Sequence, residues 1–329
     1  VLFMCVFYII NVFNPFAFLS EGANPAGIAV IHSIFNITAT IVLLPFSKGL
    51  EKLAYLTVKE EDSEKQIEAD NEFALLDERF LDKPSLALQH SFKATKNMAD
   101  ISKKCLFTSF QLLDKYDEEK VQLVSNLEDK VDKYEDILGT YLLKISSKNL
   151  SEKDSEDLTM LLHTIGNFER ISDHACNITQ AARQMYEKKL EFSEKAKEEL
   201  DVFRAALTDI VDIAFECFTK KDDNLAKNVE PLEEVIDDLN MELKARHVRR
   251  LREGRCTLDL GFVLSDITTN FERVADHCSN IAVCLIQIKN DGFDTHGYMD
   301  TVKREDNEQF KSKFSMYKKQ FKLPESRSC

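Results

Sequence analysis

The strongest constraint on this chain is an internal repeat. Residues 167–178 read NFERISDHACNI, and 103 residues later residues 270–281 read NFERVADHCSNI, with eight of the twelve positions identical. A near-copy at a long, fixed offset indicates an internal duplication of one structural unit. The two halves of the chain are therefore expected to share one fold.

Each copy of the repeat carries two acidic residues four positions apart. Glu169 precedes Asp173, and Glu272 precedes Asp276. On a helix this spacing places both carboxylates of a pair on one face, one turn apart. Because like charges at that distance repel, we expect a metal ion or an arginine opposite each pair.

A second acidic motif precedes each copy at a matching offset. Both read Leu-Glu-x-x-x-Asp, at residues 127–132 and 232–237. In each motif the acids lie one position after an apolar stripe of helical period, so they border a buried seam. Four carboxylates are therefore expected to converge in each half. The candidate metal ligands are Glu128, Asp132, Glu169 and Asp173 in the first half and Glu233, Asp237, Glu272 and Asp276 in the second.

The identity of the ion and the role of the acids stay open at this point. Oxygen ligands suit hard divalent ions such as Mg²⁺, Mn²⁺ or Ca²⁺, and carboxylate-rich sites also hold iron. The alternative is that Arg170 and Arg273, three residues before each motif aspartate, pair with the acids within the helix. His174 and His277 lie about 100° around the helix from that aspartate, so we expect them to pack between helices or cap a neighbour.

The periodicity of the chain predicts an all-α fold. Between residues 85 and 290 there are one proline, Pro231, and four glycines, which is few helix breakers for such a length. Three helices are expected in each half, and so two tandem three-helix bundles. The predicted helices span residues 85–114, 118–147, 152–188, 192–219, 222–252 and 256–289. The predicted domains are 1–50, a linker 51–84, two repeats 85–190 and 191–290, and a tail 291–329.

The first fifty residues have a different composition. Residues 1–19 and 26–46 are apolar runs, and Glu21 is the only charged residue before Lys48 apart from the ionisable His32. Their lengths match the roughly 20 residues of a transmembrane helix. Lys48 and Lys52 predict that the acidic part lies in the cytoplasm, which gives a multi-pass protein of the inner membrane. Since the chain starts at Val1, we expect it to be the C-terminal part of a longer protein.

Polar residues within and between these apolar runs have two interpretations. Asn24, His32 and Asn36 could line a transport path, or they could form hydrogen bonds that hold a helix bundle together. His32 and Asn36 share one helical face, which fits both interpretations.

Several classes of function are disfavoured. The net charge of −14, without a basic and aromatic stripe, disfavours a nucleic-acid partner. The Glu-x-x-His pattern of di-iron bundles fails because Ser172 and Ala275 stand where histidine is needed, and neither a phosphate-binding glycine loop nor a nucleophile elbow occurs. We therefore expect no enzyme activity. The basic run 244–252 is interpreted as a solvated helix end, with contact to anionic lipid or a phosphate-responsive surface as alternatives.

The paired Phe-Glu-Arg-x-x-Asp-His-x-x-Asn-Ile blocks, each preceded by Leu-Glu-x-x-x-Asp, resemble the PhoU domain over residues 85–290. That resemblance implies two three-helix bundles whose acidic motifs bind metal ions. Separately, residues 22–46 resemble the last membrane segments of the Na/Pi-cotransporter (NptA-like) family, whose Gln-Ser-Ser-type repeats are missing from this chain.

Together, the resemblances imply the C-terminal part of a sodium-dependent phosphate transporter with a cytoplasmic PhoU-like regulatory domain. Its coupling ion would be Na⁺. Its partners would be inorganic phosphate, membrane lipid, the upstream transporter helices and a second copy in a homodimer. The alternative is a membrane-anchored PhoU-type phosphate-signalling adaptor that transports nothing itself.

Overall fold

The computed structural model describes residues 32–33, 36–37, 40, 73–289 and 308–325. The chain divides into two compact units, residues 1–70 and residues 71–329. The second unit contains every long helix among the described residues.

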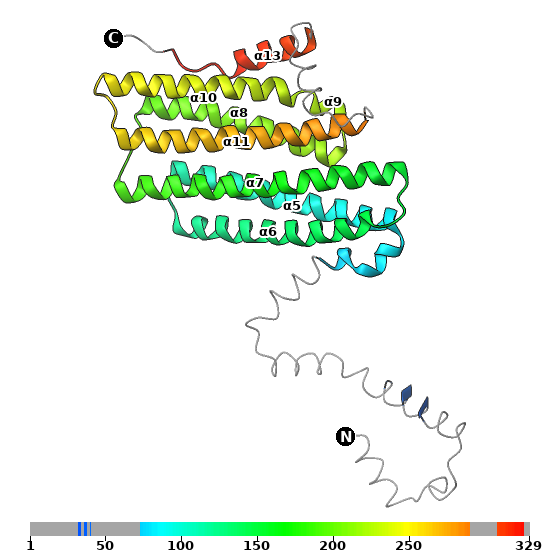
Figure 1. The fold of residues 1–329 in the computed structure, drawn as a ribbon. Helices are drawn as coiled ribbons and strands as arrows, with labels where there is room; N and C mark the ends of the chain where they lie inside the picture. Colours follow the sequence, from blue (N-terminus) through cyan, green and yellow to red (C-terminus); the bar gives the residue numbers. More distant parts are fainter. Residues whose placement is uncertain (1–31, 34–35, 38–39, 41–72, 290–307, 326–329) are drawn as a thin grey trace, which may run out of the picture. The chain divides into compact units, whose positions relative to one another are not determined.

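The first half of this unit is a three-helix bundle (Figure 1). Helices α5 (Pro84–Asp114), α6 (Glu118–Ser146) and α7 (Glu152–Lys188) pack against one another in all three pairs. Their buried residues recur at helical spacing, as in Leu127, Val131, Tyr134 and Leu138 of α6. The predicted bounds of these three helices agree with the structure to within two residues.

The second half repeats this arrangement with one change. Helices α8 (Glu194–Lys220), α10 (Val229–Arg252) and α11 (Leu258–Lys289) form the bundle, and a short helix α9 (Asp223–Ala226) precedes α10. The single helix predicted over 222–252 is therefore two. Pro231 lies in the first turn of α10, where a missing backbone N–H leaves no intrahelical hydrogen bond unmade.

The helix ends have recognisable local causes. The Ser151 side chain accepts a hydrogen bond from the Asp154 backbone N–H (3.2 Å), which fixes the start of α7 as the sequence predicts. Lys189 and Lys221 adopt left-handed backbone conformations with φ of 52°, and each ends its helix. Gly254, with φ of 67°, lies in the turn between α10 and α11, where glycine tolerates that conformation without a steric penalty.

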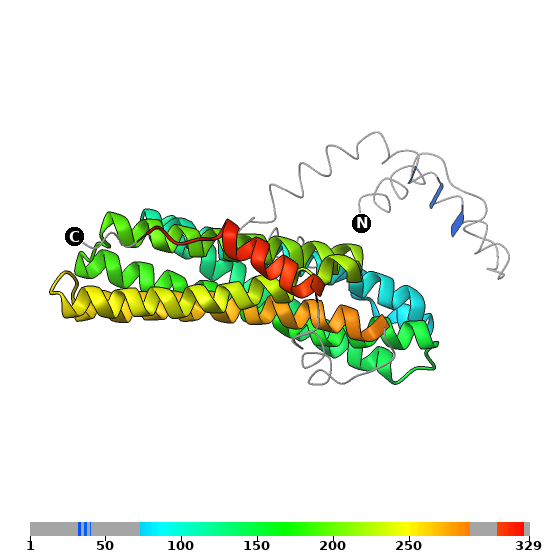
Figure 2. The ribbon, with the colours of Figure 1, turned by 90° about the horizontal axis from the view of Figure 1, so that it is seen from above.

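The two bundles share one hydrophobic core. Helices α7 and α11 lie side by side and join the bundles (Figures 1 and 2). The Phe168 ring of α7 lies 5.0 Å from the ring of Phe215 in α8, and the Phe271 ring of α11 lies 5.2 Å from that of Phe110 in α5. These two pairs are equivalent under the internal repeat. Neither bundle therefore has a complete core of its own.

The predicted location in the inner membrane is wrong. Among the residues that the structure describes, no helix combines the length and the apolar character needed to cross a bilayer. The long helices are amphipathic instead, with one buried face and charged residues on the other. The two apolar runs at residues 1–19 and 26–46 lie outside the described residues, apart from five positions between 32 and 40.

Two segments outside the predicted repeats also pack on the bundles. Within the predicted linker, the short 3₁₀ helices η3 (Ala74–Leu76) and η4 (Glu78–Asp82) contact α5. Within the predicted tail, helix α13 (Glu308–Gln320) contacts α10 (Figure 1). Neither contact is predicted by the repeat or by the helical period.

Candidate metal site on the acidic motifs

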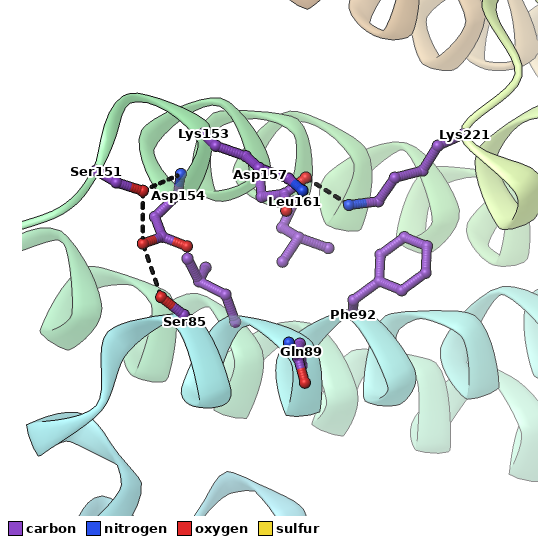
Figure 3. A pocket seen from close by; sticks show the side chains of 10 residues that line it. Ser85, Gln89, Phe92, Ser151, Lys153, Asp154, Asp157, Leu161 and Lys221 are labelled. Atoms are coloured by element: carbon purple, nitrogen blue, oxygen red, sulfur yellow. Dashed lines mark hydrogen bonds and ion pairs between the residues drawn. The ribbon is translucent and has the colours of Figure 1, made fainter.

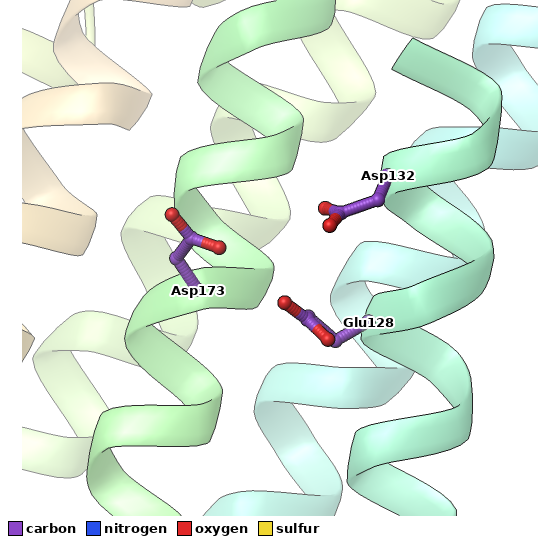
Figure 4. Close-up of side chains that lie close together, drawn as sticks. All are labelled: Glu128, Asp132 and Asp173. Carbon is purple, nitrogen blue, oxygen red and sulfur yellow. The ribbon is translucent and has the colours of Figure 1, made fainter. Parts of the chain in front are cut away.

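Three carboxylates of the first half converge between α6 and α7. Glu128 and Asp132 extend from α6, and Asp173 extends from α7 towards them (Figure 4). One carboxylate oxygen of each residue lies within 4.8 Å of those of the other two. The neighbouring seam residues Leu127 and Val131 are buried, so the helix packing itself places these acids at the border of the core.

The electrostatics of this acidic cluster (Glu128, Asp132 and Asp173) favour a bound cation. Burial and then the Asp132 charge raise the pKa of Glu128, and burial and then the Asp173 charge raise the pKa of Asp132. Glu169 lies beside the cluster on α7, and burial together with the Asp173 charge raises its pKa to about 7. Burial is the larger cause of these raised pKa values and repulsion between the acids is the second, and a bound cation would relieve both.

Arg170 forms the intrahelical pairs expected in the alternative interpretation. Its Nη1 lies 3.2 Å from Asp173 Oδ2, and its Nε lies 3.4 Å from Glu169 Oε2. The side chain is 61% exposed, and an exposed ion pair of this kind is weak. The Arg170 charge lowers the pKa of Glu169, but burial and the Asp173 charge outweigh it, so this pKa stays raised.

The second half differs at its acidic motifs. Asn240, which stands where the first half has Glu135, donates a hydrogen bond from Nδ2 to Glu272 Oε2 (3.1 Å). Arg273 Nη1 lies 3.1 Å from Asp276 Oδ2, as Arg170 does from Asp173. Glu233 is buried, while Asp237 follows one turn later on α10. In the described part of the second half, no three acids approach as closely as the first-half cluster does.

The motif histidines connect the two bundles, as expected of residues that pack between helices. His174 Nδ1 lies 2.8 Å from Asn270 Oδ1, and His277 Nδ1 lies 3.0 Å from Asn167 Oδ1. Each asparagine Nδ2 donates to the carbonyl four residues earlier, so its Oδ1 is left to accept. Each histidine therefore carries its hydrogen on Nδ1 and donates a hydrogen bond across the interface.

Asn167 and Asn270 are functional residues of the repeat that the acidic motifs alone do not reveal. The available signal was their position as the first residue of each repeated block, unchanged between the two copies. The hydrogen bonds show that the repeat preserves an interface between bundles as well as the acids.

The proposed path residues belong to the other unit of the chain. His32 Nε2 and Asn36 Nδ2 lie 3.0 Å apart, which confirms that these exposed side chains share one helical face. Asn24 lies outside the described residues.

A cavity of about 370 Å³ lies between the starts of α5 and α7 and the end of α8 (Figure 3). Its charged lining is balanced, because Lys221 pairs with Asp157 and Asp154 accepts hydrogen bonds from Ser85 and Ser151. Lys221 also lies 4.6 Å from the centroid of the Phe92 ring. With its charges compensated, this cavity is a weaker candidate for an ion site than the acidic cluster.

Comparison with known proteins agrees with the repeat and the fold. The curated relative "Phosphate-specific transport system accessory protein PhoU homolog 1" of Thermotoga maritima is 33% identical over 129 residues, which are 39% of this chain and 55% of the relative. This chain thus spans about half the length of that relative.

Two solved structures share the fold. The crystal structure of PhoU from Pseudomonas aeruginosa matches with a TM-score of 0.58 at 18% identity, covering 64% of this chain and 99% of that one. The phosphate transport system regulatory protein PhoU from Streptococcus pneumoniae matches with a TM-score of 0.56 at 17% identity, covering 63% and 95%.

The PhoU domain family model matches twice, once in each half, at residues 95–182 and 205–285. These ranges make up just over half of the chain and confirm the resemblance drawn from the repeated motifs. They do not reach residues 22–46, so the resemblance to a sodium–phosphate cotransporter stays a prediction. The chain belongs to the PhoU domain family.

Proposed function

We propose that this chain is a regulatory accessory protein of phosphate transport that transports nothing itself. The supporting observation is the PhoU fold, present in both halves, together with a relative described as an accessory protein of a phosphate-specific transport system. The relatives are described as accessory or regulatory proteins, which agrees with the expectation that the chain is not an enzyme. The alternative of a sodium-coupled transporter depends on residues 22–46 alone.

We further propose that the acidic cluster binds a divalent cation, and this proposal rests on its geometry. Glu128, Asp132 and Asp173 offer oxygens from two helices within 4.8 Å of one another. A cation bound there would remove their repulsion and would hold α6 against α7. The carboxylate set suits Mg²⁺, Mn²⁺ or Fe²⁺, and ligand type alone does not select among them.

The second-half acids would form a weaker site. Asn240 Nδ2 already donates to Glu272, so a cation there must displace this donor or turn the amide. Rotation of the amide would present Asn240 Oδ1, a neutral oxygen, in place of a carboxylate. The first-half site is therefore expected to fill first.

Calorimetric titration of the metal-free protein with Mn²⁺ tests the site. Asp132→Asn with Asp173→Asn should weaken the first binding event about a hundredfold, because two of three anionic ligands are lost. Asp129→Asn with Asp136→Asn is the matched control: it also removes two charges, from exposed positions on α6 beside the cluster. Equal Mn²⁺ affinity in the cluster variant and the control would overturn the site.

Reconstitution separates regulation from transport. Vesicles containing only this chain should not accumulate labelled phosphate when a sodium gradient is applied. In cells that lack their own accessory protein, the chain should change the phosphate uptake of a separately encoded transporter. Sodium-driven accumulation in the vesicles would refute the regulatory proposal, whatever the metal titration shows.

A further inference from the structure

Helix α13 covers the face of the second bundle formed by α8 and α10. It lies along α10 in both views (Figures 1 and 2). Tyr317, Phe321 and Leu323 are buried there, each no more than 8% exposed. The aromatic residues Phe310, Phe314, Tyr317 and Phe321 follow one another at spacings of four, three and four, which gives the helix one apolar face.

Polar contacts position α13 along its length. Lys318 Nζ lies 2.7 Å from Asp238 Oδ2 on α10, and Gln320 Nε2 donates to Asp209 Oδ2 on α8 (3.0 Å). At the end of the segment, Arg246 Nη1 donates to the carbonyl of Pro324 (2.7 Å). Together these contacts fix how residues 308–325 lie on the face formed by α8 and α10.

Charge complementarity accompanies the apolar contact. Residues 308–325 contain five lysines and two glutamates, whereas Asp209, Asp238 and Glu242 line the α8–α10 side. A basic amphipathic helix on an acid-rimmed apolar groove is a recognised form of helix recognition, in which apolar anchors supply affinity and charges set orientation.

Helix α13 leaves part of this face uncovered. A surface groove of about 550 Å³ stays open between α10 and the end of the segment. Its apolar lining includes Val235, Leu239, Phe321 and Leu323, and its charged lining is Asp238, Glu242, Arg246, Lys318 and Lys322. A partner helix could therefore make contacts beside α13 that α13 itself does not make.

The same face of the first bundle is covered in an equivalent way. Tyr141, 105 positions before Arg246, donates from its hydroxyl to the Asp77 carbonyl (2.9 Å), just as Arg246 donates to that of Pro324. The Phe73 ring lies 4.7 Å from that of Tyr134, the counterpart of Leu239. Both covering segments lie outside the residues matched by the family model.

The two segments that cover the bundles, here called the first cover (residues 73–82) and the second cover (residues 308–325), differ in how they join the bundles. The first runs directly into α5, since only Lys83 separates η4 from that helix. The second follows 18 residues, 290–307, after α11. The first cover is therefore continuous with its bundle, whereas 18 residues of sequence separate the second from its bundle.

From these observations we infer that the α8–α10 face is a docking groove for a basic amphipathic helix with an aromatic face. Helix α13 occupies the groove as an intramolecular ligand, and a partner protein presenting a helix of the same chemistry replaces it. Because α13 belongs to the same chain, a partner helix competes with an intramolecular ligand and must bind more tightly than a free helix of equal contacts would need to. This inference does not depend on the metal proposal.

Binding of a labelled peptide in trans tests the inference. The probe is a fluorescein-labelled synthetic peptide of residues 308–325, measured by fluorescence anisotropy against the full chain. Tyr317→Ala with Phe321→Ala should weaken the intramolecular helix and raise the apparent peptide affinity about tenfold or more. Met316→Ala, at an exposed position on the same helix, is the matched control and should leave the affinity unchanged.

Two further arms make the test specific. Adding Asp238→Lys to the Tyr317/Phe321 variant should reduce peptide capture, because Lys318 of the peptide would then face a like charge. A peptide with its lysines replaced by glutamate should not bind. The inference is overturned if no variant captures the peptide of natural sequence while the circular dichroism spectrum is unchanged. It is also overturned if the unaltered chain and the Tyr317/Phe321 variant capture that peptide equally.

Hydrogen exchange on the unaltered protein covers the case in which the variant misfolds. Amides of 308–320 should exchange faster than those of α10, and excess peptide should accelerate them further. If the amides of α13 and α10 were equally protected against exchange, α13 would be a permanent part of the core, and this result would contradict the inference. Dimerisation of the Tyr317/Phe321 variant at micromolar concentration, seen by light scattering, would assign the groove to a second copy instead.

Discussion

His174 and His277 face each other across the interface of α7 and α11, with ring centroids 5.5 Å apart, and each donates a hydrogen bond to an asparagine of the opposite helix. The pairing is reciprocal, because His174 contacts Asn270 and His277 contacts Asn167. The repeated blocks thus recognise each other, which explains why histidine and asparagine recur together with the acids.

Removing one asparagine should destabilise the joined bundles. Asn270→Ala leaves the Nδ1–H of His174 without its acceptor at a part-buried site, which costs about 1–3 kcal/mol of unfolding free energy. Asn167→Ala should cost a similar amount through His277. Urea denaturation measures both, with Asn126→Ala on the surface of α6 as the control. A loss no larger than that of the control would contradict the role given to these hydrogen bonds.

The His277 environment predicts loss of stability in acid. Burial, with the His174 charge second, lowers the pKa of His277 from 6.5 to about 4. Between these values the unfolded chain binds more protons, so stability falls as the pH drops from 6.5 towards 4. The expected loss near pH 5 is about 1–2 kcal/mol. Titration of His277 by nuclear magnetic resonance with a midpoint near 6.5 would refute this.

Glu169 predicts the opposite dependence in the metal-free protein. Its pKa is raised from 4.5 to about 7, so the folded state holds more protons between these values, and stability falls as the pH rises through them. Above neutral pH the penalty is roughly 1–2 kcal/mol after allowance for solvent screening. Glu169→Gln should remove it, and so should saturating Mn²⁺. Because the His277 effect has the opposite sign over part of this range, the test compares the unaltered protein with Glu169→Gln, and the same change of melting temperature with pH in both would argue against the shift.

Two helical glycines offer a paired test of packing. A Cβ at Gly261 of α11 would lie 2.7 Å from Nε2 of the buried His247 ring, so Gly261→Ala should destabilise by about 1–3 kcal/mol. A Cβ at Gly166 of α7 would meet no atom within 4 Å, so Gly166→Ala should stabilise by roughly 0.5–1 kcal/mol through helix propensity. Thermal melts of both variants check the signs, and equal shifts would contradict the packing argument.

Glu199 anchors the basic run on α10. Its two carboxylate oxygens accept from Arg246 Nη1 (3.0 Å) and Arg250 Nη1 (2.6 Å), and its side chain is 1% exposed. Glu199→Gln leaves two largely buried guanidinium groups without this carboxylate, which should cost about 3–5 kcal/mol. Glu198→Gln, at the exposed neighbouring position, is the control. Similar unfolding midpoints for the two variants would show that the pairing contributes little.

The repeat and its helical period were sufficient to predict six helices, two bundles and the faces that carry the acids. They did not predict the break between α9 and α10, because Pro231 fits both a continuous start and a new helix. The solvated helix end expected at 244–252 was wrong for Arg246 and Arg250, since their buried partner Glu199 lies about 50 positions away in the sequence.

Helix α13 was not predicted from the sequence, for a different reason. It has 13 residues, a length at which an isolated helix is marginal, and its stability comes from contacts with α10. The difference between the two acidic sites was visible as Glu135 against Asn240, but only the folded chain shows that the amide contacts Glu272. Local sequence specifies the helices, whereas contacts between distant segments decide what occupies their faces.

The shared core bears on how such a chain could have arisen. Phe168 of one half packs on Phe215 of the other, and Phe271 packs on Phe110 in return. This reciprocity is the geometry of a two-fold symmetric dimer, in which the same patch of each copy meets itself. A single ancestral repeat could satisfy its aromatic surface only by self-association, and joining the end of α7 to the start of α8 made that association permanent. After the fusion, the surfaces of the halves were free to diverge separately, whereas each aromatic pair had to change together.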